Sequence, residues 1–250
     1  MHLIDVKSPT DLKGLSIAEL TDLTAQARQA MMAKVSEHGG HCGPPMGAAE
    51  MIMALHYVFN SPVDKIVYDV SHQSYVHKMV TGRALAFLDH NHYDDVTGYT
   101  DPTESEHDFF NIGHTSTSIS LASGLATARN LKGDSENIIA IIGDGSLSGG
   151  EAFEGLDYAA TLDSNMIIIV NDNDQSIAEN HGGLYRGLSE LRKTNGESSN
   201  NIFKAIGLDY RFVAKGNDLE TLIDVFNDVK DIDHPIVLHI VTQKGKGYAI

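Results

Sequence analysis

The sequence has little cysteine and few basic residues, and each shortage excludes a class of protein. A single cysteine, Cys42, excludes an internal disulfide, so nothing in the chain favours an oxidising compartment. Only 18 lysines and arginines stand against 34 aspartates and glutamates, which gives a net charge of −16. Nucleic acids and anionic membranes attract basic surfaces, so we expect neither of them as a partner.

Long apolar runs are also missing. The two longest, residues 138–142 and 166–170, have the length of strands and are too short to cross a bilayer. The first ten residues lack the apolar stretch of a signal peptide. We therefore expect a cytoplasmic protein. Its 250 residues suffice for one large domain, residues 1–250, and no low-complexity linker or tandem repeat divides them.

The chain instead shows a regular alternation of helical and strand patterns. Strands are predicted at 65–69, 138–142, 166–170, 210–213 and 235–241, and helices at 17–37, 46–59, 73–81, 83–88, 117–130, 149–161, 201–206 and 219–229. Residues 89–108 have the composition of a loop, and residues 185–201 that of a short connector, either a lid or disordered. Continuously apolar strands between helices predict an α/β fold, a parallel sheet with helices on both faces.

Two polar motifs directly follow the two most apolar strands. Gly143-Asp144-Gly145-Ser146 comes after the first, and Asn171-Asp172-Asn173 begins 27 residues beyond Asp144, after the second. Turn-forming residues are common after strands, so either motif alone has an ordinary structural explanation. Together, at the carboxyl edge of a parallel sheet, they predict a ligand site. Oxygen ligands beside glycines suit Mg²⁺ and a diphosphate.

This pair resembles the thiamine-diphosphate motif. Other segments are similar to the N-terminal domain of the 1-deoxy-D-xylulose-5-phosphate synthase family, in the transketolase superfamily: 41–43, 69–78, 104–106, 113–118, 173–180 and 244–248. Residues 40–47 are closer to ordinary transketolases. The resemblance implies the thiamine-diphosphate-binding fold, with thiamine diphosphate and Mg²⁺ as cofactors. It also implies that the Mg²⁺ ligands are Asp144, Asn173 and the backbone carbonyl of Gln175.

The resemblance assigns further roles residue by residue. His41 and His72 are expected beside the reactive ring and the substrate as catalytic residues. Cofactor contacts are expected from His72, Gly113, His114, Thr115, Gly143, Asp144, Gly145, Ser146, Asn173, Gln175, Ile177 and Lys244. Singly, each histidine is more often structural, and a lone lysine after a strand is usually solvated. Only the shared segments favour the functional interpretation of these side chains.

The resembled family contains more than this sequence. Its pyrimidine-binding and C-terminal domains, with the glutamate that activates the cofactor, have no counterpart in residues 1–250. We therefore expect a chain that is inactive alone and needs a second domain or chain. The predicted reaction joins pyruvate to glyceraldehyde 3-phosphate, for isoprenoid biosynthesis, and the partners are these small substrates and a second copy in a homodimer. The alternatives are a transketolase subunit and a non-catalytic cofactor-binding module.

Two departures from the family stand out. The family synthases carry a long insertion where this chain has the connector 185–201. A family Gly-His-Asp is here Gly216-Asn217-Asp218, and the lost histidine is one that the resemblance links to the choice of acceptor. A nicotinamide-dependent enzyme is a weaker alternative, because no Gly-x-Gly-x-x-Gly follows an early strand.

Overall fold

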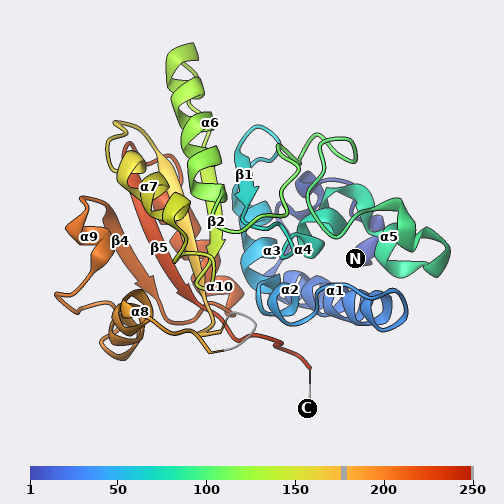
Figure 1. The fold of residues 1–250 in the computed structure, drawn as a ribbon. Coiled ribbons are helices and arrows are strands. Elements are labelled where there is room, and N and C mark those ends of the chain that lie inside the picture. The colour runs from blue at the N-terminus through green and yellow to red at the C-terminus, as the bar shows by residue number, and fades with distance from the viewer. Residues whose placement is uncertain (176–178, 249–250) are drawn as a thin grey trace.

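The computed structural model describes residues 1–175 and 179–248 (Figure 1). In these residues five strands form one sheet in the order β1-β2-β3-β5-β4. All four neighbouring pairs are parallel. The strands are β1 (Lys65–Tyr68), β2 (Ile138–Gly143), β3 (Met166–Asp172), β4 (Asp209–Val213) and β5 (Pro235–Val241). The predicted α/β fold with a parallel sheet is therefore confirmed.

Alternate residues of the central strands supply two separate cores. On one face Ile139, Ile141 and Ile167 pack with the buried sides of α1 (Ile17–His38), α3 (Ala49–Val58) and α10 (Leu219–Val229). On the other face Ile138 and Ile142 pack with α6 (Ser118–Lys132) and α7 (Gly150–Ala159). Strands covered on both faces need apolar side chains throughout, which explains their continuous apolar runs.

Shorter helices complete the layers seen in Figure 1. They are η1 (Leu3–Asp5), η2 (Pro9–Leu12), α2 (Gly43–Gly47), α4 (Tyr75–Lys78), the π-helical turn η3 (Met79–Arg83), α5 (Leu85–Leu88), η4 (His90–Asp95), α8 (Gly183–Lys193) and α9 (Ile202–Ala205). In Figure 1 the N-terminal helices α1 to α5 lie together on one side of the sheet, and α6 to α9 lie on the other.

Most predicted elements are found within a few residues of their expected bounds. The capping box is one reason: Glu19 N donates to Ser16 Oγ (3.3 Å) and Ser16 N donates to Glu19 Oε2 (2.8 Å), which fixes the start of α1. The predicted helix 46–59 is two helices, α2 and α3, which meet at Ala48. Pro44 and Pro45 lie inside the first turn of α2 rather than before it. The loop 89–108 contains the short helix η4.

The connector prediction was wrong. Residues 183–193 form α8, whose Leu188 and Leu191 are buried against the core of Ile138 and Ile142. Gly187 lies in the interior of this helix and weakened its sequence signal, because glycine disfavours helix interiors; Gly182 and Gly183 lie at its start. A segment expected to be a lid or disordered is thus a packed helix.

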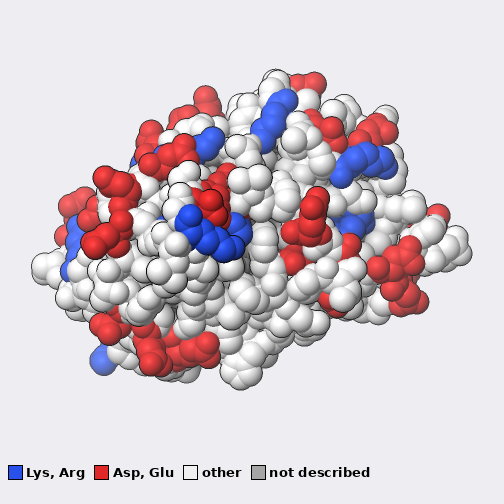
Figure 2. Space-filling view, turned by 90° about the horizontal axis from the view of Figure 1, so that it is seen from above, with Lys and Arg blue, Asp and Glu red and all other residues white. Residues whose placement is uncertain are grey.

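The surface agrees with the acidic composition. Figure 2 shows red carboxylate groups spread over one face, with basic groups in small separate clusters between them. Among the helices that the structure describes, none is long and apolar enough to cross a membrane.

Candidate functional site

The two polar motifs meet at the carboxyl edge of the sheet. Gly143 is paired with Asn171 in the β2–β3 register, and Asp144 N donates to the Asn171 carbonyl at 3.1 Å. Asp144 is only 2% exposed. The parallel register therefore places both motifs side by side, as the alternation of strands and helices predicted.

Within residues 1–175 and 179–248, the donors to the Asp144 carboxylate are all neutral. Asn180 Nδ2 donates to it at 2.7 Å, and the backbone N–H groups of Asn173 and Gly145 also donate. Burial, reinforced by the negative charge of Asp172, raises the pKa of Asp144 to about 7. Burying the ionised Asp144 carboxylate therefore costs free energy, and a bound cation would offset that cost.

The three residues of the second motif have different partners. Asn171 is used inside the fold, because its Nδ2 donates to Gln73 Oε1 (3.1 Å) and its Oδ1 accepts from Thr242 Oγ1 (2.6 Å). Asp172 accepts from Arg192 and His239. Asn173 Oδ1, in contrast, is buried and has no hydrogen-bond partner in the part of the chain that the structure describes. Of the three side chains, Asn173 is the one with an oxygen left for a ligand.

These oxygens fit a hard cation. Asp144 and Asn173 lie in adjoining loops and present a carboxylate and an unpaired amide oxygen, both suited to Mg²⁺. Within residues 1–175 and 179–248 no cluster of three or more His, Cys, Asp or Glu is arranged to hold a metal. A cation here would therefore need ligands from outside those residue types, such as phosphate oxygens and carbonyls. Gln175 is exposed and bridges to Glu179, and the predicted contact Ile177 lies outside the described residues.

His41 and His72 come together from distant segments. Their ring centroids are 5.1 Å apart, and Tyr99 lies edge-on to His41 at 5.7 Å. In the described part of the chain neither buried Nδ1 has a hydrogen-bond partner. Burial lowers the pKa of both rings, that of His72 to about 4. Both imidazoles are therefore neutral at pH 7, and each has a nitrogen that can accept a proton.

Backbone strain turns His72 toward this position. Val70 and Ser71, directly after β1, have φ values of 57° and 66°, in a region that non-glycine residues rarely adopt. Ser71 is held by its hydroxyl, which donates to the Ile112 carbonyl (2.6 Å) and accepts from Thr100 N (2.9 Å). Such strain persists only where surrounding contacts enforce it, and it is common at functional sites.

Lys244 lies beside the histidine pair. Its aliphatic chain passes so close to Gly43 that a Cβ there would lie 3.3 Å from Lys244 Cγ, and Gly245 N donates to the Gly43 carbonyl at 2.9 Å. The positive charge of Lys244 also helps to lower the pKa of His72. The structure thus places Lys244 against Gly43 and within electrostatic reach of His72.

The turn at Gly113, His114 and Thr115 is exposed and is fixed by the residue that follows it. Ser116 Oγ donates to the Ser146 carbonyl at 2.7 Å, and Ser116 N donates to Asp69 Oδ1 at 3.0 Å. His114 Nδ1 lies 2.7 Å from the Thr115 carbonyl, within its own turn. This predicted cofactor segment therefore adjoins Ser146 and the Gly143 loop.

Sequence reasoning missed several residues that build this edge. Asp69 fastens the 113–118 turn to β1, and Gln73 links the His72 loop to Asn171. Asn180 binds Asp144, and Tyr185 of α8 donates to the Gly145 carbonyl at 3.2 Å. Their partners are remote in sequence, so no local spacing could have identified them.

Comparison with known proteins shows which family the chain belongs to. The sequence matches the family described as 1-deoxy-D-xylulose-5-phosphate synthase over residues 3–200 and 190–242. The chain belongs to this family. It is 42% identical to the synthase of Caldanaerobacter subterraneus subsp. tengcongensis over 282 residues, covering 98% of this chain and 45% of that protein. It is also 42% identical to the synthase of Listeria monocytogenes serotype 4b over 254 residues, covering 99% of this chain and 42% of that protein.

The chain thus spans less than half the length of these synthases. The Caldanaerobacter alignment is longer than the chain, as expected if that synthase carries the insertion. The Listeria alignment is almost as short as the chain itself, so a curated synthase also lacks a long insertion. The short segment around α8 therefore does not set this chain apart from the synthase family.

Solved transketolases share the fold. The transketolase of Campylobacter jejuni aligns with a TM-score of 0.73 at 20% identity, over 93% of this chain and 39% of the other. The transketolase of Leishmania mexicana aligns with a TM-score of 0.69 at 20% identity, over 94% and 38%. At this identity the likeness to transketolases concerns the fold alone.

Proposed function

We propose that these residues form the diphosphate-binding domain of a thiamine-diphosphate-dependent transferase of the synthase type. Mg²⁺ would be held by Asp144, Asn173 and the Gln175 carbonyl, and the diphosphate would lie along Gly143, Gly145 and Ser146. The observation that carries the proposal is the pair of adjoining loops in which a buried carboxylate has only neutral donors and Asn173 Oδ1 has no partner among the described residues.

The remaining site residues would surround the rest of the cofactor. His41 and His72, neutral at pH 7, would exchange protons with substrate oxygen atoms, and Lys244 beside them would face a phosphate or carboxylate. Gly113, His114 and Thr115 would contact the cofactor from the turn fixed to Ser146. Bound thiamine diphosphate supplies an electron sink for breaking and forming a bond at a carbonyl carbon.

The whole reaction would need a pyrimidine-binding part, which corresponds to the length of the synthases that this sequence does not span. It would come from the same protein or from a partner chain, in a homodimer or a mixed assembly. We propose pyruvate and glyceraldehyde 3-phosphate as substrates, because the sequence relatives at about 40% identity are synthases. In the complete assembly, decarboxylation of pyruvate with glyceraldehyde 3-phosphate supports this choice, whereas ketose cleavage would favour a transketolase.

Asn217, where the family motif has histidine, does not argue for a non-catalytic module. Its Nδ2 donates to the Gly47 carbonyl (2.8 Å) and to Glu50 Oε2 (2.9 Å), and its Oδ1 accepts from Gln243 N (2.8 Å). We propose that it ties α2 and α3 to the end of β5 and takes no part in proton transfer.

Calorimetric titration of thiamine diphosphate, with and without Mg²⁺, tests the proposal. The 250-residue chain should bind only with Mg²⁺, and Asp144→Ala and Asn173→Ala should each weaken binding by about 100-fold. Asp228→Asn is the matched control, because that carboxylate forms only an exposed pair with Arg211. Metal-independent binding, or wild-type affinity in both site variants, would contradict the proposed site.

A further inference from the structure

The guanidinium of Arg192 binds the residues on both sides of Asn173. Arg192, in the last turn of α8, donates through Nη1 to Asp172 Oδ2 (2.6 Å) and through Nη2 to Asp174 Oδ1 (2.5 Å). The two aspartates are the immediate neighbours of Asn173. A planar guanidinium can bridge two carboxylates at once, which a lysine ammonium does less well.

Side chains of β4 and β5 also hold the turn from Asp172 to Asp174. Asp172 is completely buried and accepts from His239 Nε2 of β5 at 2.7 Å, while His239 Nδ1 lies 2.8 Å from Tyr210 Oη of β4. Asp172 Oδ1 accepts from Asp174 N at 3.0 Å, closing a tight turn around Asn173. Asp174 itself has a φ of 62°, so the turn is strained and needs such contacts.

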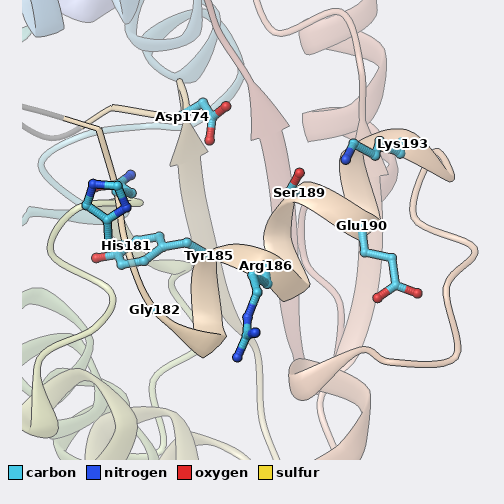
Figure 3. Close-up of a pocket in the computed structure, with 9 residues that line it drawn as sticks. Asp174, His181, Gly182, Tyr185, Arg186, Ser189, Glu190 and Lys193 are labelled. Atoms are coloured by element: carbon cyan, nitrogen blue, oxygen red, sulfur yellow. The ribbon is translucent and has the colours of Figure 1, made fainter.

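In the described part of the chain, the hollow next to this loop gives Asp174 no ion pair besides the one with Arg192. It has a volume of about 620 Å³ and is lined largely by α8 residues and residues 180–182. In Figure 3 Arg186 and Glu190 extend away from Asp174, and Tyr185 turns toward His181. Among the described residues, the ion pairs between α8 and the loop are those that Arg192 makes with Asp172 and Asp174.

We propose that Arg192 is a positioning residue, which fixes the turn from Asp172 to Asp174 so that Asn173 Oδ1 points at the Mg²⁺–diphosphate. This inference rests on the proposed function. In this proposal α8 holds the metal-binding loop in position, whereas the sequence suggested that this segment is a lid or disordered. The family resemblance assigned no role to Arg192 or to α8.

The sign of the effect separates positioning from simple electrostatics. Removing the cation Arg192 leaves two carboxylates nearer to Mg²⁺ without compensation, so charge alone would tighten metal binding. Positioning predicts the reverse, because Asn173 would lose its fixed orientation. Asp174→Asn removes one end of the same link, and Asn tolerates the positive φ at this position. Charge alone and positioning both predict weaker binding for that variant.

The experiment compares Arg192→Gln, Asp174→Asn and the double variant in the 250-residue chain. The readout is the Mg²⁺ concentration that gives half-maximal binding of thiamine diphosphate, with the melting temperature measured alongside. We expect each single variant to need about tenfold more Mg²⁺. The double variant should resemble Arg192→Gln, because Arg192→Gln already breaks the link to Asp174 that Asp174→Asn removes. Arg211→Gln, at an exposed ion pair, should behave as wild type.

Other results would overturn the inference. If Arg192→Gln binds Mg²⁺ as tightly as wild type or more tightly, or if the double variant returns to wild type, charge rather than position controls the site. A lower melting temperature with an unchanged Mg²⁺ requirement would make Arg192 purely structural. Should Arg192→Gln fail to fold, a wild-type Mg²⁺ requirement in the exposed-site variant Asp174→Asn would still reject the proposal. Failure of wild type to bind with Mg²⁺ would instead reject the proposed function.

Discussion

Two buried aspartates, Asp108 and Asp144, show how differently this fold treats charge. Asp108 accepts from Arg83 Nη1 and Nη2 (2.7 and 3.0 Å), from His77 Nε2 (2.7 Å) and from Asp101 N (2.9 Å). Burial alone would raise its pKa, but the bonds from His77 and Arg83 hold the pKa of Asp108 well below the usual value. Asp144 has only neutral donors among the residues that the structure describes, and its pKa rises to about 7.

Asp108 belongs to a network whose charges are balanced within the chain, whereas Asp144 lies in a site where we propose that a cation binds. Asp108 has a cationic partner, so removing its charge leaves Arg83 without its main counter-ion. None of the described donors that bind Asp144 is a cation, so removing its charge removes the free-energy cost of burying an unpaired carboxylate. Stability and ligand binding should therefore respond in opposite ways at the two positions.

The largest effect is expected from the isosteric exchange at these positions. Asp108→Asn should lower the free energy of unfolding by about 3 kcal/mol, because a buried ion pair loses one partner. Asp144→Asn should change it by less than about 1 kcal/mol at pH 8 without divalent cations, because the lost carboxylate had no ion pair. Urea unfolding in a chelator measures both. Equal losses in the two variants would break the comparison.

A somewhat smaller effect is expected from acid. The pKa of His77 is lowered by burial to about 4 in the fold, whereas it is about 6.5 in the unfolded chain. The unfolded chain therefore binds the proton first, and stability falls as the pH drops from about 6.5 to about 4. The share of His77 is on the order of 3 kcal/mol at most.

Urea midpoints between pH 7 and pH 4 check this dependence. In His77→Gln the side-chain amide can still donate to Asp108 but cannot be protonated, so the fall with acid should be shallower. A fall as steep as in wild type would show that His77 is not the group responsible. His56 and His72, whose pKa values are also lowered by burial, would retain their own shares.

The smallest effect is expected at Asn217, a polar residue at the carboxyl edge whose amide is satisfied within the chain. Asn217→Ala should cost about 1–2 kcal/mol, because the Gln243 N–H and the Gly47 carbonyl lose a partner. The affinity for thiamine diphosphate with Mg²⁺ should stay as in wild type. A loss of affinity without a loss of stability would place Asn217 with the cofactor residues.

Much of the fold could be predicted because short stretches of sequence show it, as apolar runs for buried strands and capping residues for helix starts. The apolar runs 138–142 and 166–170 predicted buried strands, and Ser16 with Glu19 marked the start of α1. The helix α8 was missed because its glycines weaken the helical signal, while its stability comes from the buried Leu188 and Leu191. Tertiary packing decided that element, and a single segment does not reveal tertiary packing.

The part of the site at the ends of β2 and β3 was predictable, because neighbouring parallel strands end at the same edge of a sheet. Placing Asp144 beside the second motif needed only the rule that parallel strands end at one edge. Bringing His41 to within ring contact of His72 needed the strained turn at Val70 and Ser71, which no residue type there signals. The contacts of Asn180 and Arg192 join segments that only the folded chain places together.

The strand order also predicts a sequence of events in folding. Ile139 pairs with Ile167 across a single helix, whereas Lys65 pairs with Ile138 only after the long excursion that carries His72 and His114. Contacts between distant residues form more slowly, because a longer loop must close first. The β2–β3 pair that ends at Gly143 and Asn171 should therefore form early, and the histidines should reach it late. An incompletely folded chain would then have the strand ends beside Asp144 paired before the residues proposed for catalysis reach them.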